Sequence, residues 1–380
     1  MAGVGVSNPQ TWYLNNQNPA LLIFNRITVF QAGIIAENKR IYSDTIKGKS
    51  RNANLNYLVI GFPLMRKKTT GEVRWATAIG LMPYSFVNYN YQYSDSVNGL
   101  EVRYFDKAEG GFNQFYWSNG IRVTRDLSVG LKTSVLFSSI ISDYSNILND
   151  PNQNIKYVPN VHELQSVRGV KFTPALSYRV DSIANKYAFN FGATYELKAK
   201  LSSRLEQVLE RKNLTGDILQ SDTITNNSER IYFPERITAG VSFGRLDKWT
   251  LGSDFTLTRP AGSLAKLGID KVQVQNGWRL SFGGEITPDV RSLSSYLKRV
   301  TYRAGASAEQ STYLVNGNTL KDFGINFGLS FPVNRFSSLD VAFRTGKRGD
   351  KVLNGIEENY FKIYFGVTFN DQWFIKRRFD

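Results

Sequence analysis

The sequence predicts an all-β protein, a 14-stranded antiparallel transmembrane β-barrel of the outer-membrane type. Apolar and polar side chains alternate along many segments, for example 323–331 and 361–369. Short connections alternate with long ones, as in barrels with tight turns at one end and long loops at the other. The mean hydropathy is −0.30, and no apolar run reaches the roughly 20 residues that a spanning helix needs.

The strands follow from this alternation. Most predicted segments reach the roughly 9–11 residues that a tilted strand needs to cross a bilayer, and an even number of strands fits a bacterial single-chain barrel. Residues 22–62 alternate poorly, and 94–111 could hold a further hairpin. The predicted strands are 22–37, 53–62, 73–93, 112–123, 126–141, 167–180, 186–199, 231–244, 248–258, 272–287, 297–309, 320–331, 337–345 and 357–370.

The connections separate into two kinds. The short ones are 124–125, 181–185, 245–247 and 332–336, and the long ones are 37–52, 142–166, 200–230, 259–271, 310–319 and 346–356. Within the longest, Ser203 is followed three residues later by Glu206, which is a capping-box pattern. We therefore expect a short helix near 202–209. The end with short turns is expected to face the periplasm.

A soluble β-sandwich would also show alternation. Here, however, aromatic residues lie near both ends of single strands on the apolar face, as Phe172 and Tyr178 do. Such pairs are typical of the two aromatic girdles of a membrane barrel. Strand length, even strand number and loop asymmetry agree with this interpretation, although aromatics also have high intrinsic β-propensity.

Composition argues against most enzyme classes. The chain has 380 residues, no Cys and one His, which removes thiolate chemistry and leaves too few ligands for a usual zinc or haem site. The G-x-S-x-G match at 240–244 lies inside an alternating strand and not at a strand-to-helix turn. His162 lies in a predicted loop. We expect no enzyme activity, no catalytic residue, no metal and no cofactor.

The basic excess has several interpretations. Lys and Arg number 47 against 32 acidic residues, a net charge of +15. The basic residues are dispersed, not clustered with aromatics, so we expect no nucleic acid partner. The alternation places eleven of them in the lumen, either in carboxylate pairs that stiffen the wall or as an anion-attracting interior. Four of these are the candidate lumenal site residues: Arg279, Arg299, Arg303 and Lys362. A further group could meet lipopolysaccharide outside: Lys39, Arg40, Lys47, Lys49 and Arg51.

The N-terminus carries a family resemblance. Gly3-Val4-Gly5-Val6, followed by Asn18-Pro19-Ala20, resembles the start of mature FadL-type outer-membrane transporters. The resemblance implies a 14-stranded barrel with a lumenal hatch, here residues 1–21, before a barrel of 22–370 and a periplasmic tail of 371–380. The expected hatch and ligand residues are Gly3, Gly5, Trp12, Tyr13, Leu14, Asn18, Pro19 and Ala20.

The resemblance leaves two functions open. A FadL-like barrel would handle a small hydrophobic or amphipathic ligand near Trp12, Tyr13 and Leu14. The chain is shorter than typical fatty-acid transporters, however. Its composition, with abundant Tyr and Asn and no Cys, resembles that of barrels of the Bacteroidota, some of which serve secretion, such as the type IX shuttle protein. The alternative is a structural or adaptor subunit of an outer-membrane protein machine. The expected location is the bacterial outer membrane, in a form whose signal peptide has been removed, with outer-membrane lipid and other outer-membrane or periplasmic proteins as partners.

Overall fold

The protein is a closed antiparallel barrel. The computed structural model describes residues 1–43, 47–97, 100–149, 157–183, 186–245, 248–260, 273–334 and 337–371. Its strands are β1 (Thr28–Ser43), β2 (Lys47–Arg66), β3 (Val73–Val97), β4 (Leu100–Arg122), β5 (Leu127–Asn149), β6 (Val158–Ile183), β7 (Tyr187–Glu196), β8 (Ala199–Lys212), β9 (Ile218–Phe233), β10 (Glu235–Arg245), β11 (Trp249–Arg259), β12 (Gly277–Ile286), β13 (Thr301–Val315), β14 (Asn318–Pro332), β15 (Ser337–Asp350) and β16 (Ile356–Asp371). No helix among these residues is long and apolar enough to cross a membrane.

Fourteen of the strands form the ring, which confirms the predicted fold class. β1 pairs with β16 along its whole length and closes the seam between the two ends of the chain. The other two strands, β8 and β9, form a hairpin that continues β7 and β10 beyond the ring. β6 pairs with β7 through its second half and with β8 through its first half.

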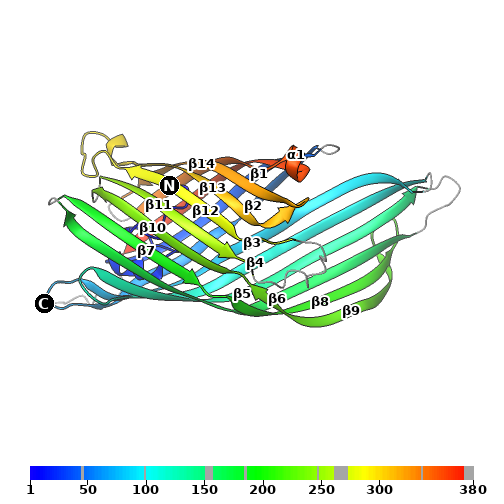
Figure 1. Ribbon diagram of the computed structural model, residues 1–380, viewed down its shortest axis with the longest axis horizontal. Coiled ribbons are helices and arrows are strands. Elements are labelled where there is room, and N and C mark those ends of the chain that lie inside the picture. Colours follow the sequence, from blue (N-terminus) through cyan, green and yellow to red (C-terminus); the bar gives the residue numbers. More distant parts are fainter. Residues whose placement is uncertain are drawn as a thin grey trace.

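At the end opposite the tight turns, β3, β4, β5, β6, β8 and β9 extend far past the other strands (Figure 1). The pairing of β2 with β3 stops at Leu58–Leu81, and β3 continues for sixteen residues along β4 alone. We call this extension the wing: residues 83–97, 100–112, 138–149, 158–168, 199–212 and 218–233. At its base, Leu136, Val167 and Leu201 belong to a small buried apolar cluster.

The side-chain register agrees with the alternation in the sequence. Phe327 and Phe365 point outward with 57% and 50% of their surface exposed, and the polar residues between such positions face the lumen. Outward apolar side chains on a closed ring have no protein core to enter, so they are matched to a lipid environment.

Several predictions of local structure were wrong. Residues 202–209 are strand β8, because the first half of β6 offers them a ladder that satisfies their backbone groups. The connections predicted as long loops are mostly strand: β1–β2, β8–β9 and β13–β14 are hairpins. Residues 94–111, which could have held a further hairpin, extend β3 and β4 instead. β1 begins at Thr28, not at 22, since Pro19–Phe24 form a 3-10 helix, η1. Residues 297–299 form a second one, η3, before β13. The predicted tail lies outside the described residues apart from Asp371, which ends β16.

Candidate functional site: the plugged lumen

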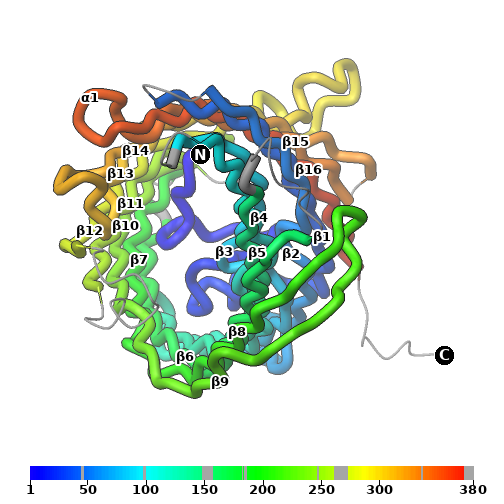
Figure 2. Tube along the Cα trace, turned by 90° about the vertical axis from the view of Figure 1, so that its right-hand side faces the viewer, coloured from blue at the N-terminus to red at the C-terminus, as the bar shows by residue number. Residues whose placement is uncertain are grey.

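The N-terminal segment, residues 1–27, lies inside the ring of strands (Figure 2). We call it the plug. Asn18 fixes its course: its side chain caps η1 by accepting from the Ala20 N–H at 2.9 Å and donates to the carbonyl oxygens of Val6 at 2.7 Å and Leu176 at 3.0 Å. Pro19 occupies the first turn of η1, where its missing N–H costs nothing. One asparagine thus joins two parts of the plug to the wall.

Glycines in the barrel wall leave the space in which the plug backbone lies. A Cβ atom built on Gly283 or Gly305 would lie 2.7–2.8 Å from atoms of Met1, and one on Gly192 would overlap the Val6 carbonyl. Gly120 and Gly130 face Pro19 and Ala20 in the same way. Backbone of the plug therefore lies directly on backbone of the wall over much of the circumference.

Polar wall residues bind the plug backbone. The Asp254 carboxylate accepts from the N–H groups of Gly5 and Val6 at 2.7 and 2.9 Å. The Lys132 ammonium donates to the Asn16 carbonyl at 3.0 Å, and Arg279 donates to the Ala2 carbonyl at 3.0 Å. These bonds satisfy plug groups that no secondary structure pairs.

The structure places the predicted plug residues as follows. Gly3 adopts φ +98° beside the Arg279 guanidinium, a conformation that favours glycine. Leu14 packs with Val59, Tyr116 and other wall residues in a buried apolar cluster. The Tyr13 hydroxyl hydrogen-bonds to Ser338 at 3.0 Å, and Trp12 is 40% exposed. The apolar side chain of Leu14 therefore helps to seat the plug, whereas that of Trp12 stays partly exposed.

Three of the four predicted lumenal cations are held in ion pairs. Arg303 contacts Glu285 at 2.9 Å and Asp340 at 3.6 Å, and lies over the Tyr13 ring. Lys362 binds Glu37 at 2.8 Å and Arg279 approaches Glu309 at 3.7 Å. The prediction for Arg299 was wrong: it lies in η3, stacked on Tyr296, because β13 begins only at Thr301.

Sequence reasoning missed the residues that fix the plug most directly. Asp254 was not among the predicted site residues, and its isolation on a Gly- and Ser-rich face was the available signal. The cluster Lys171, Glu196 and Arg236 was also missed; Glu196 lies 2.5 Å from Lys171 and 3.7 Å from Arg236. These residues come from β6, β7 and β10, which only the folded barrel brings together.

Above the plug the lumen widens into a cavity of about 720 Å³. We call it the vestibule. Its walls carry both charges and aromatic rings, including Tyr84, Lys132, Lys171, Glu196, Arg236 and Arg279. The vestibule therefore has four cations against the three carboxylates of Glu196, Asp254 and Glu309 in its wall, and it ends on the plug.

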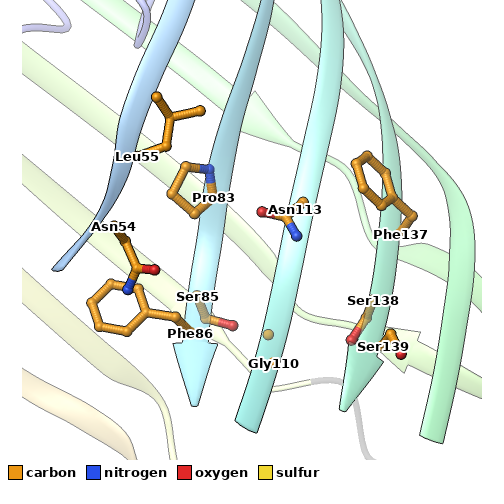
Figure 3. Close-up of a pocket in the computed structure, with 11 residues that line it drawn as sticks. Asn54, Leu55, Pro83, Ser85, Phe86, Gly110, Asn113, Phe137, Ser138 and Ser139 are labelled. Atoms are coloured by element: carbon orange, nitrogen blue, oxygen red, sulfur yellow. The ribbon is translucent and has the colours of Figure 1, made fainter. Parts of the chain in front are cut away.

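A second cavity, of about 420 Å³, lies on the outside of the wall where the wing bends away (Figure 3). We call it the exterior groove. Leu55, Pro83 and Phe137 give it an apolar lining, and Gly110 and Gly111 form its floor. Both glycines have positive φ, +126° and +145°, and the β3 ladder shifts at Pro83/Ser85. The groove is thus a product of the bend in the sheet.

Solved structures of FadL-type outer-membrane channels resemble this chain. A FadL homologue of Pseudomonas aeruginosa matches with TM-score 0.63 and 12% identity, covering 98% of this chain and 96% of that one. The Pseudomonas putida toluene transporter TodX gives 0.62 and 14%, with 97% and 95% covered. The CymD monoaromatic hydrocarbon channel gives 0.58 and 13%, with 97% and 95% covered. The resemblance to FadL-type barrels is confirmed as a likeness of fold. The search of curated proteins gave no match.

The model of one protein family, BamG, matches residues 1–380. The chain belongs to the BamG family. A BamG-family protein thus has the fold of FadL-type channels, with plug and vestibule included in the matched length. The predicted link to type IX secretion barrels stays a prediction.

The wing of this BamG-family barrel carries the single histidine. His162 lies in β6, not in a loop, and its Nδ1 is 2.9 Å from Asp143 Oδ1. Ligand atoms of Asp143, His162 and Glu210 lie within 4.8 Å of one another. The Lys212 ammonium, 2.9 Å from Glu210, and the Asn160 amide already supply donors to both carboxylates. The cluster is a cross-strand hydrogen-bonded network that ties β5, β6 and β8 together.

Proposed function

We propose that the protein is a bacterial outer-membrane barrel that does not conduct solutes and serves as a structural or adaptor subunit of an outer-membrane protein machine. The wing is the observation that carries this proposal. Its ordered sheet extends beyond the ring, and two of its edges have no strand beside them in the described part of the chain. The short-turn end faces the periplasm, as in other barrels with this asymmetry.

The edges of the wing suit a protein partner. β3 beyond Leu81 and the whole of β9 each pair on one side only. Such edges present unpaired backbone donors and acceptors and are templates for strand addition. Exposed apolar side chains accompany them, including Tyr91, Tyr93, Ile218 and Ile224.

The lumen offers little support for passage of a solute. Residues 1–27 lie against wall glycines, and wall side chains hold the plug backbone from several strands. A transporter of this shape would have to move a segment that is packed to backbone contact. A role that needs only a stable barrel makes no such demand.

The test is isolation of the protein from native membranes in mild detergent. We expect a stoichiometric complex with other outer-membrane or periplasmic proteins. Removing 209–222 shortens the wing and should abolish the complex. Val208 and Thr223 can then be joined by a two-residue turn, because they are already partners in the β8–β9 ladder. Removing 312–319, a hairpin tip at the same end but outside the wing, is the control. A monomer, or a complex that survives the wing deletion, would overturn the proposal.

A second function has one observation in its favour. The exterior groove is apolar, and the barrel shares its fold with proteins named as hydrocarbon channels and toluene transporters. On this alternative the barrel handles a small hydrophobic ligand at the bend of β3. Accumulation of labelled toluene by cells with and without the protein separates the two functions. Equal accumulation removes the alternative.

A further inference from the structure

The outward face of the β1–β2 hairpin changes from apolar to basic as it rises from the membrane-facing wall. In order, the partners on this face are Ile34–Leu55, Ala36–Ala53, Asn38–Arg51, Arg40–Lys49 and Tyr42–Lys47. Ile34 and Leu55 are exposed apolar residues, and all four cations are exposed. The hairpin therefore carries a patch of four positive charges directly above the apolar belt.

The patch brings like charges side by side. Arg40 and Lys49 are direct cross-strand partners, an arrangement that destabilises a sheet unless an anion lies between the two charges. None of the four cations forms an ion pair within the described chain. On the neighbouring strand, Glu357 lies opposite Tyr42, but its carboxylate is bound to Lys347 at 2.8 Å.

The height of the patch matches a lipid head group. Arg51 lies four residues above Leu55 on the same strand, which is about 13 Å along the strand at 3.3–3.4 Å per residue. A tilt of about 45° reduces this to roughly 9 Å along the membrane normal. Arg51 and Lys49 therefore lie just outside the hydrocarbon region when Leu55 lies at its border.

The exterior groove lies beside the patch. Leu55 lies on the same outward face as the patch and also lines the groove, so β2 links the two. β2 has no neighbour on that side above Leu58, which leaves the path from groove to patch open. An amphiphile with an apolar tail and an anionic head would contact both.

We propose that this face is a binding site for a phosphorylated glycolipid of the outer leaflet, with its phosphate groups at Arg40, Lys49 and Arg51 and an acyl chain in the exterior groove. Guanidinium groups bind phosphate in a two-point geometry, and basic clusters at the membrane border attract anionic head groups. The proposal rests on the outer-membrane location proposed above. An acidic protein segment would satisfy the charges but would leave the apolar groove below them empty.

The test uses the purified barrel alone, so its result does not depend on any protein partner. The barrel is reconstituted in nanodiscs of phosphatidylcholine, and retention of added bisphosphorylated lipid A is measured by native mass spectrometry. We expect Arg40→Gln/Lys49→Gln/Arg51→Gln to lower retention at least fivefold. Lys67→Gln/Lys68→Gln/Arg125→Gln, which removes three exposed charges at the other end of the barrel, should retain lipid A like the wild type.

Two further measurements separate the contribution of the lipid phosphates from that of the acyl chain. Dephosphorylated lipid A should be retained no better by the wild type than by the triple variant. Leu55→Trp, which fills the groove, should weaken lipid A retention while binding of inorganic phosphate at the patch is unchanged. Equal retention by the wild type and the basic-face variant, or equal retention of both lipids, would overturn the proposal and leave the proposed function untouched. If the triple variant instead retains lipid A normally but loses its protein partner when isolated from native membranes, the patch belongs to that partner and the lipid proposal fails.

Discussion

At the scale of single residues, the barrel is defined by which wall positions carry no side chain. The alternation in the sequence correctly indicated that small residues such as Gly192 face inward. It could not indicate which glycines meet the plug, because that depends on the path of a segment without regular structure. Asp254 shows the same limit: its inward direction follows from the register, but its two N–H partners lie about 250 positions away in the chain.

Gly192→Ala should displace the plug, because the added methyl group would overlap the Val6 carbonyl. Overpacking of this kind costs roughly 1–3 kcal/mol. We expect a lower urea midpoint and cleavage of residues 1–27 by added protease. Gly48→Ala is the matched control, since its nearest neighbour would be the Ile41 Cβ at an ordinary 3.9 Å. Identical protection in the two variants would contradict the contact at Gly192.

At the scale of elements, the period-two alternation of apolar and polar residues was sufficient to predict the strands of the ring but not those of the wing. Strands such as 320–331 and 357–370 were predicted almost to their ends, since each has one lipid-facing and one lumenal face. Beyond the membrane both faces of a strand are hydrated, so apolar and polar residues alternate less clearly. The sequence of β8 was therefore predicted to be helical. What makes β8 a strand is the neighbouring β6 ladder, which no local pattern encodes.

The two faces of β14 should respond differently to substitution. Phe327→Arg places a charge on the outward, lipid-facing side, at an expected cost of roughly 2–4 kcal/mol near the membrane midplane. Asn326→Ser changes a lumenal neighbour and should cost far less. Folding from urea into liposomes, followed by gel mobility with and without boiling, measures both. Comparable losses for the two would show that the register is displaced by one residue.

The wing should loosen in acid while the ring does not. Burial works to raise the pKa of Asp143, but the hydrogen bonds from His162 and Asn160 together with the charge of Lys212 hold it below its usual value. Burial also works to raise the pKa of Glu210, but the hydrogen bonds from Lys212 and Asn160 hold this pKa below its usual value. A depressed carboxyl pKa contributes stability above the unfolded value of about 4, and this stability is lost as the pH falls through the folded value.

Hydrogen exchange measures this directly. Protection factors for 138–149 and 158–168 should fall between pH 5 and pH 3, with those of β14 and β16 unchanged. The double variant Asp143→Asn/Glu210→Gln lacks both titrating groups, so its wing should show a much flatter pH profile. A wild-type profile retained in that variant would mean that other groups control the wing.

At the scale of the whole molecule, the plug, the ion pairs and the ring form one closed unit, and the wing is an addition to it. The even strand number and the loop asymmetry were enough to predict the ring, and the Gly-rich start with Asn18-Pro19-Ala20 pointed to the plug through a family resemblance. The vestibule and the exterior groove were not predictable, since the first depends on the path of the plug inside the ring and the second on the bend of the sheet at the Pro83/Ser85 shift. The predicted ligand pocket at Trp12, Tyr13 and Leu14 has no counterpart among the cavities described, because Tyr13 and Leu14 are used in packing.

Deleting residues 2–17 should leave a folded barrel, because the β1–β16 seam and η1 lie outside the deletion. The emptied space joins the vestibule, so single-channel conductance in planar bilayers should rise well above that of the intact protein. Heat-dependent gel mobility is the control for folding. An unchanged conductance in a folded deletion variant would mean that wall side chains, and not the plug, close the lumen.

The short connection between η1 and β1 has a kinetic and thermodynamic consequence. Only residues 25–27 separate the end of η1 from the start of β1, so the plug is a tethered ligand of its own barrel. A short tether gives an effective concentration in the millimolar range, independent of how dilute the protein is. A free peptide of residues 1–17 would therefore compete poorly with the intact chain, yet should bind the deletion variant in a concentration-dependent way, and its dissociation constant would measure how firmly the barrel is closed.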